Sequence, residues 1–139
     1  MKTLRRSILT LFFGMVLAAG CEHADPLDPN RIEPTLSSIQ MNIFNLNCAF
    51  SGCHGGATPQ LGLNLSAGQV RATTVNVQSV ENANLFRIAP GDPDNSYLVW
   101  KIEGRPEIAG ERMPRGRAPL PQDQINAIRQ WIADGALDN

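Results

Sequence analysis

The sequence predicts a mostly α-helical domain over residues 35–139. Segments with helical periodicity stand at both ends of this region, at 35–48 and 121–135. The stretch 103–121 between them is rich in proline and glycine, which excludes another long helix there. Aromatic residues make up only 6% of the chain, so we expect a small core.

The first twenty residues have the composition of an export signal rather than of a folded element. Lys2, Arg5 and Arg6 precede the apolar run ILTLFFGMVL, and small residues follow up to Cys21. The run is too short to cross a hydrocarbon core of about 30 Å as a helix. The ending LAAGC resembles a bacterial lipoprotein signal, which implies that residues 1–20 are removed and that Cys21 is lipidated. The alternative is ordinary cleavage nearby, which leaves Cys21 as a free thiol.

Residues 21–34 are predicted to be a flexible tether between the lipid and the domain. The segment EHADPLDPNRIEP has three prolines, several charges and little apolar content. Without residues 1–20 the chain keeps nine basic and thirteen acidic residues, a net charge of −4, so nucleic acid is not an expected partner. We therefore expect an exported protein, anchored by its lipid to a membrane and facing the periplasm or the cell surface.

An amphipathic helix is predicted over 35–48. Its apolar positions recur at helical spacing, at Leu36, Ile39, Ile43 and Leu46. Ser37 and Gln40 match a capping box, which predicts that the helix begins there. Met41 lies on the same helix and is expected to pack in the core.

A second helix is predicted near the end of the chain. Pro121 suits its first turn, and Gly135 lies just beyond its last turn as a C-cap. Trp131 is expected to pack where this helix crosses the first one. The apolar face beside it consists of Ile125, Ile128 and Ile132.

The middle of the domain has weaker patterns. Residues 66–72 are predicted to form a short helix, and 96–102 a second one after the turn residues PGDPDNS. The segments 74–80 and 85–89 have the composition of short strands, so a short β-hairpin is an expected addition to the helical fold. The stretch 103–121 is predicted to be an irregular loop.

The segment NCAFSGCHGG at 47–56 carries the densest group of potential ligands. A structural zinc site needs four ligands, usually as two pairs. Here Cys48, Cys53 and His54 have no partner pair, because Cys21 and His23 lie before the domain. A disulfide between the two cysteines of the segment is permitted in an exported protein but leaves the histidine without a role. Covalent attachment of haem is the third interpretation, and it uses all three residues.

In haem attachment, two thiols add to the two vinyl groups of the porphyrin, and the histidine after the second thiol binds the iron. The usual signature is C-x-x-C-H, whereas this segment reads C-x-x-x-x-C-H. Small residues at Ser51 and Gly52 permit the longer bulge. Gly55 and Gly56 let the chain turn sharply close to the macrocycle. A buried prosthetic group would also enlarge the small core.

Met113 is the candidate for a second axial ligand. A low-spin haem that transfers electrons needs a ligand on its far face, and a methionine thioether is common opposite histidine. Beyond the signal only Met41 and Met113 remain. Met113 lies between Arg112 and Pro114 in the irregular loop, which is a poor place for a core residue and a suitable one for a ligand.

With these motifs in order, the chain resembles the bacterial monohaem c-type cytochromes over residues 36–136. The similar segments are CAFSGCHGG, GLNLS, PGDPDNSYLVWKI, RMPRG and LPQDQINAIRQWIADGA. The resemblance is to exported cytochrome c-like domains that have the longer attachment spacing. It implies a small helical domain wrapped around one covalently bound haem. The implied roles are thioether attachment at Cys48 and Cys53, proximal iron ligation by His54 and distal iron ligation by Met113.

The histidine has a predicted orientation. His54 is expected to bind iron through Nε2 as a neutral imidazole and to donate its Nδ1 hydrogen to a backbone carbonyl.

Four arginines surround Met113 in sequence. They either pair with the haem propionates, form a docking rim for an acidic redox partner, or serve only to keep the loop solvated. Tyr97 and Trp100 are expected to be core residues, with contact to the haem as the alternative. The arginines are Arg105, Arg112, Arg115 and Arg117.

The expected function is one-electron transfer between redox partner proteins. Two protein ligands fill the coordination of the iron, so neither a small-molecule substrate nor an enzymatic activity is expected. Two alternatives remain open. One is a haem-based sensor or ligand-binding lipoprotein in which Met113 is displaced. The other is a haem-free interaction lipoprotein stapled by a disulfide between Cys48 and Cys53.

Overall fold

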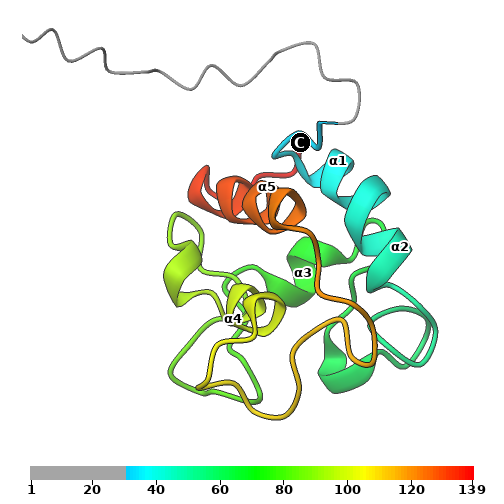
Figure 1. Cartoon of the computed structure of the whole chain (residues 1–139), viewed down its shortest axis with the longest axis vertical. Coiled ribbons are helices and arrows are strands. Elements are labelled where there is room, and N and C mark those ends of the chain that lie inside the picture. The colour runs from blue at the N-terminus through cyan, green and yellow to red at the C-terminus, as the bar shows by residue number, and fades with distance from the viewer. Residues whose placement is uncertain (1–30) are drawn as a thin grey trace, which may run out of the picture.

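Helices are the regular elements of residues 31–139, the part of the chain that the computed structural model describes (Figure 1). The expected mostly α class is confirmed. The predicted signal at 1–20, the lipidated Cys21 and most of the predicted tether lie outside the described residues. Within residues 31–139, no helix has the length and apolar character needed to cross a membrane. In chain order the elements are α1 (Leu36–Ile39), η1 (Gln40–Phe44), α2 (Asn45–Asn47), η2 (Gln60–Gly62), α3 (Val70–Thr74), η3 (Pro93–Asn95), α4 (Tyr97–Glu103) and α5 (Gln122–Ala133).

The first predicted helix is present as α1, η1 and α2 in direct succession, but its cap differs from the prediction. Thr35 has an extended backbone, and its hydroxyl oxygen accepts a hydrogen bond from the Ser38 amide at 3.2 Å. The predicted capping box of Ser37 and Gln40 is therefore wrong, because the helix begins earlier. The Gln40 side-chain amide instead donates to the Leu65 carbonyl at 2.9 Å.

The middle of this helix, η1, is a π-helix, and it changes which residues face inward. The Asn45 amide donates to the Gln40 carbonyl, five residues back, which adds a residue to the turn and rotates everything after it. After this turn Leu46 is 60% exposed, so the prediction that Leu46 lies on the inner face is wrong. Met41 is 68% exposed, and the prediction that it packs in the core is also wrong. Met41 lies two residues from both Ile39 and Ile43, which are buried, and so it faces the opposite side of the helix.

The terminal helix α5 forms the core against the first helix, as predicted. Trp131 is fully buried, and α5 contacts α1 (Figure 1). Gly135 follows the helix with a φ of +101°, and Pro121 is the residue just before its first turn. The chain then returns to α1, where Asn139 accepts hydrogen bonds from the Leu36 and Ser37 amides. These contacts satisfy two amides at a helix start that have no partner within the helix.

The middle segments form less regular structure than predicted. Helix α4 matches the predicted 96–102 closely, while α3 begins at Val70, four residues after the predicted start. The two predicted strands meet only through isolated bridges, Val75 with Ile88 and Gln78 with Phe86. Asn76 has a φ of +56°, which interrupts the extended run. The predicted hairpin is therefore reduced to these bridges.

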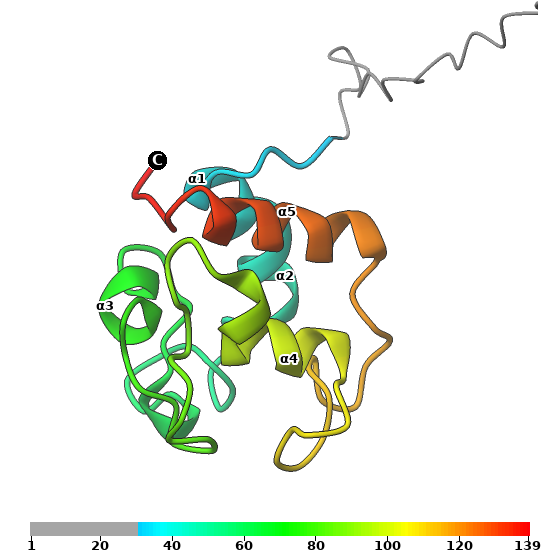
Figure 2. The same cartoon turned by 90° about the vertical axis from the view of Figure 1, so that its left-hand side faces the viewer.

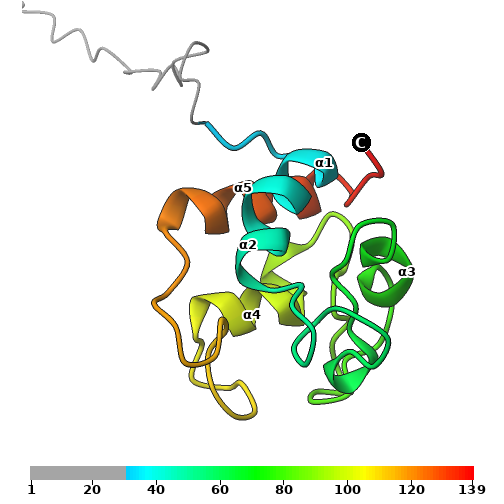
Figure 3. The same cartoon turned by 90° about the vertical axis from the view of Figure 1, so that its right-hand side faces the viewer.

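Four charged side chains fix α4 against α5. Asp94 and Glu103 each pair with both Arg105 and Arg129, at distances from 2.6 to 3.3 Å. In Figures 2 and 3, α5 lies across α2 and above α4, on the side where the C-terminal residue lies. The irregular segments after α2 and after α4 both lie at the opposite end of the domain. That end holds the candidate site.

Candidate functional site

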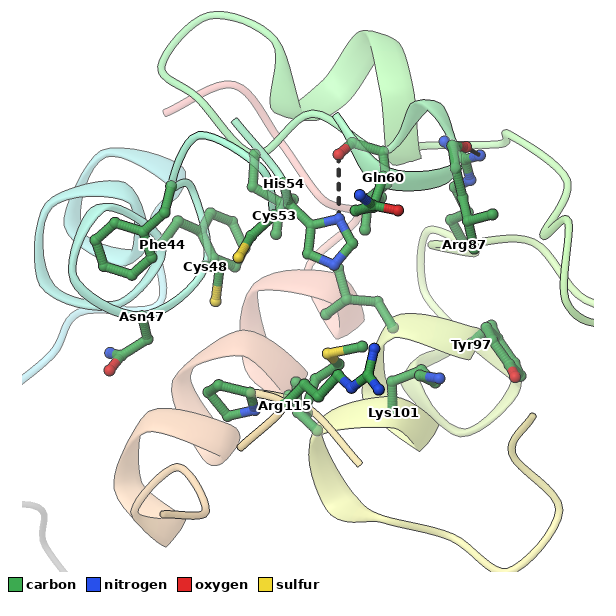
Figure 4. Close-up of a pocket in the computed structure, with 18 of the residues that line it drawn as sticks. Phe44, Asn47, Cys48, Cys53, His54, Gln60, Arg87, Tyr97, Lys101 and Arg115 are labelled. Atoms are coloured by element: carbon green, nitrogen blue, oxygen red, sulfur yellow. Dashed lines mark hydrogen bonds between the residues drawn. The ribbon is translucent and has the colours of Figure 1, made fainter. Parts of the chain in front are cut away.

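A cavity of about 620 Å³ lies between the turn that follows α2, helix α4 and the loop that follows α4 (Figure 4). Its volume is within the range of about 300–1,000 Å³ that is typical of small-molecule and cofactor sites. Cys48, Cys53, His54 and Met113 all line it, although 60 residues separate Cys53 from Met113 in the sequence. The structure therefore brings the four predicted haem residues together. The apolar walls include Phe44, Leu65, Leu98, Ile102, Leu120 and Ile128.

The four residues between the cysteines fold back as a closed turn. The His54 amide donates to the Cys48 carbonyl at 3.2 Å, and the Cys53 amide donates to the Phe50 carbonyl at 3.0 Å. Gly52 has a φ of +81°, a conformation that favours glycine. The segment between Cys48 and Cys53 is thus a compact turn closed by two backbone hydrogen bonds. Figure 4 shows the side chains of both cysteines on the same side of the cavity as the His54 ring.

Gly55 is the tightest point of this turn. It is buried, and a Cβ atom built on it would lie 2.3 Å from the Ala49 carbonyl oxygen. Its φ is not in the left-handed region, so it is the close approach of the two chain segments that requires glycine here. The close neighbour of Gly55 is thus the Ala49 backbone, and its predicted passage near a macrocycle stays a prediction.

We expect Gly55→Ala to destabilise the protein by about 1–3 kcal/mol, because the clash is with backbone atoms that cannot rotate away. A loss of this size lowers the melting temperature by roughly 5–20 °C for a domain of this length. Thermal unfolding followed by circular dichroism measures the effect. Ala57→Ser, at an exposed position of the same segment, is the control and is expected to leave the melting temperature unchanged. Equal melting temperatures for Gly55→Ala and the wild type would show that the turn opens freely.

The His54 ring is held by one edge and presents the other edge to the cavity. Its Nδ1 lies 3.3 Å from the Leu63 carbonyl oxygen, the dashed contact in Figure 4, so Nδ1–H donates to it in the tautomer that leaves Nε2 free. Burial lowers the pKa of His54, with the Leu63 and Gln60 carbonyls acting in the opposite direction. The ring is thus neutral near pH 7, the form that binds metals. The sequence predicted a backbone carbonyl as the partner of Nδ1, and in the structure this carbonyl belongs to Leu63.

Both cysteines of the cluster are free thiols in the structure. Cys48 is partly buried, and burial raises the pKa of its thiol to about 12 although the Arg117 guanidinium acts in the opposite direction. A thiol that stays protonated at neutral pH is a weak nucleophile toward disulfides and ordinary substrates. Cys53 is exposed at the edge of the cavity.

Met113 is fixed by its backbone as well as by its neighbours. Its amide donates to the Lys101 carbonyl in α4 at 2.8 Å, and its side chain packs against the hydrophobic core. The preceding residue, Arg112, lies over Gly104, where an added Cβ would come within 2.6 Å of the Arg112 Cδ. The loop is irregular, as predicted, yet Met113 has a defined place in the cavity wall.

The four arginines around Met113 do not act as one group. Arg115 and Arg117 line the cavity, and the Arg117 guanidinium lies 4.7 Å from the centre of the Phe50 ring. Arg105 is paired with Asp94 and Glu103, and Arg112 covers Gly104. Only Arg115 and Arg117 are placed to meet a bound group.

The two aromatic residues of α4 also have different surroundings. Tyr97 is buried and lines the cavity. Trp100 donates its indole N–H to the Asp94 carbonyl at 2.5 Å. The Arg105 guanidinium carbon lies over the Trp100 ring, 5.2 Å from the ring centre.

Three charged residues of the cavity wall were not foreseen from the sequence. Lys101 is only 7% exposed and pairs with Glu81 at 3.2 Å. Arg87 donates to the carbonyls of Leu61, Gly62 and Thr73, which ties the turn before α3 to the rest of the domain. Lys101 could have been found from the sequence, because it is a charged residue within the otherwise apolar run SYLVWKI. Nothing in the neighbouring sequence indicates that Glu81 and Arg87 line the cavity.

Within residues 31–139, no group of three or more His, Cys, Asp or Glu side chains is arranged to hold a metal ion. The cluster at 48–54 thus offers one histidine and two thiols at the edge of a large apolar cavity. Comparisons with protein-family models, with curated proteins and with solved structures give no match to this chain. The site is therefore interpreted from its own chemistry.

Proposed function

We propose that the protein is an exported, lipid-anchored one-electron carrier of the c-type cytochrome kind. The observation that supports this best is the shared cavity, where Cys48, Cys53 and His54 from one segment meet Met113 from another. Neither a disulfide nor a zinc site gives a reason for Met113 or for a largely apolar cavity of this size. A covalently bound haem gives a reason for both.

The residues suit the attachment chemistry. Each cysteine would add its S–H across one vinyl group, so that sulfur bonds to one vinyl carbon, hydrogen to the other, and nothing is released. His54 would offer Nε2 to the iron while Leu63 fixes the ring, and Met113 would offer its thioether. The haem, when bound, supplies a reversible one-electron couple of iron.

The ligand set favours electron transfer over substrate chemistry. Histidine and methionine together leave no coordination position for oxygen or peroxide, and this pair raises the reduction potential. The proposed partners are other redox proteins, and Arg115 and Arg117 beside the cavity suit either an acidic partner or the carboxylates of the haem.

The direct test is a haem stain on a denaturing gel. The full chain, with its own export signal, is produced in a bacterium that matures c-type cytochromes, and the gel is stained for peroxidase activity. We expect a stained band at the mass of the mature protein, because only covalently bound haem survives denaturation. A protein band without stain, from a host that matures a control cytochrome in parallel, would contradict the proposal.

A further inference from the structure

Two side chains of α4 hold the loop that carries Met113. Tyr97 and Lys101 are four residues apart, so they lie on the same face of the helix one turn apart. Both reach the backbone of Ala109. The Ala109 amide donates to the Tyr97 hydroxyl at 2.9 Å, and the Lys101 ammonium donates to the Ala109 carbonyl at 2.6 Å.

Lys101 makes a second connection to the same loop. Its own carbonyl accepts the Met113 amide hydrogen at 2.8 Å. The loop is thus attached to α4 at Ala109 through side chains and at Met113 through the backbone. Between these two points the chain is exposed at Gly110 and Glu111 and has no regular structure.

We infer that Tyr97 and Lys101 are positioning residues that set the place of the Met113 thioether as distal iron ligand; this rests on the proposed function. Neither side chain has to touch the iron for this role. They act through Ala109, whose two backbone polar groups they occupy, and thereby limit the conformations open to the three residues between Ala109 and Met113.

The burial of Lys101 supports a specific role over simple packing. An ammonium group that is removed from water is costly unless it is paired and hydrogen-bonded. Lys101 meets this condition, because its ammonium donates a hydrogen bond to the Ala109 carbonyl and forms an ion pair with the Glu81 carboxylate at 3.2 Å. Burial of an apolar side chain at this position would avoid the cost altogether, but it would leave the Ala109 carbonyl without its donor and the loop free to move.

The experiment compares Lys101→Leu, Tyr97→Phe and Arg129→Gln with the wild type, in full-length protein purified with its haem. Three quantities are measured: covalently bound haem, the far-red absorption band that reports a methionine–iron bond, and hydrogen exchange of the Ala109 and Met113 amides. Arg129→Gln is the control, because it removes ion pairs from Asp94 and Glu103 without touching the loop at Ala109.

For Lys101→Leu we expect unchanged covalent haem, loss of most of the far-red band, and exchange of the two amides accelerated by about 10- to 100-fold, as the loss of a hydrogen bond to a charged group implies. Tyr97→Phe removes only one hydrogen bond between neutral groups and is expected to accelerate exchange by about 2- to 10-fold with partial loss of the band. The Tyr97→Phe variant also keeps the test decisive if Lys101→Leu does not fold. The control is expected to match the wild type.

An intact far-red band and unchanged exchange in both variants, with haem bound, would overturn the inference and leave the proposed function standing. Absence of covalent haem from the wild type would overturn both. Loss of the band in the control as well would show that any weakening of α4 has this effect, and it would also contradict a specific role for Tyr97 and Lys101.

Discussion

Replacing both Cys48 and Cys53 by alanine is expected to abolish covalently bound haem and, with it, cooperative unfolding of the domain. The first effect follows from the chemistry, because no thioether forms without a thiol. His54 and Met113 remain in this variant, so any haem that binds is held by coordination alone and is lost on a denaturing gel.

The second effect follows from the cavity. Without an occupant, the apolar walls of the cavity of about 620 Å³ have no packing partner on one side and are left to water, which enters beside the exposed Leu61 and Val80. The apolar burial that the occupant would supply is therefore lost from a domain whose total stability is only about 5–15 kcal/mol.

Thermal unfolding by circular dichroism, together with the haem stain, measures both effects. Ser51→Ala is the matched control, since it changes an exposed residue of the same turn and keeps both thiols. We expect it to retain haem and a wild-type transition. A haem-free double variant that unfolds as cooperatively, and at the same temperature, as the wild type would show that the side chains alone complete the core.

Local chemistry explains which features were predictable. The face of α5 around Trp131 has an uninterrupted helical period, a proline before it and a glycine after it, so its place in the core follows from the sequence. The cluster at 48–54 and Met113 in its proline-bounded loop carry their ligand chemistry in the residue types themselves. Helix α5 and the candidate ligand residues could therefore be predicted without information on contacts between distant segments.

The features that were missed depend on contacts between distant segments or on a local change of helical geometry. The π-helix turns Leu46 outward, and no single residue in QMNIF indicates it. The attachment of Lys101 to Ala109 and to Glu81 is made by segments 8 and 20 residues away. In each case packing decided between conformations that the local sequence permits equally.

Met113→Ala is expected to remove the far-red methionine–iron band while covalent haem is retained. In the proposed function the thioether is the ligand that raises the potential, so its loss should lower the reduction potential by on the order of 0.2 V, within the range of about 0.8 V that axial ligands span. Spectroscopic titration against redox mediators measures this. Met41→Ala is the matched control, because Met41 is 68% exposed and does not line the cavity.

The same variant separates an electron carrier from a haem sensor. In a carrier, Met113 stays bound in both oxidation states, so carbon monoxide should leave the spectrum of the reduced wild type unchanged and should change that of Met113→Ala. In a sensor, the wild type itself would respond, because its function requires Met113 to be displaced. The attachment of Met113 to the Lys101 carbonyl and of its loop to Ala109 opposes such displacement. A wild-type response to carbon monoxide equal to that of Met113→Ala would therefore replace the carrier proposal with the sensor.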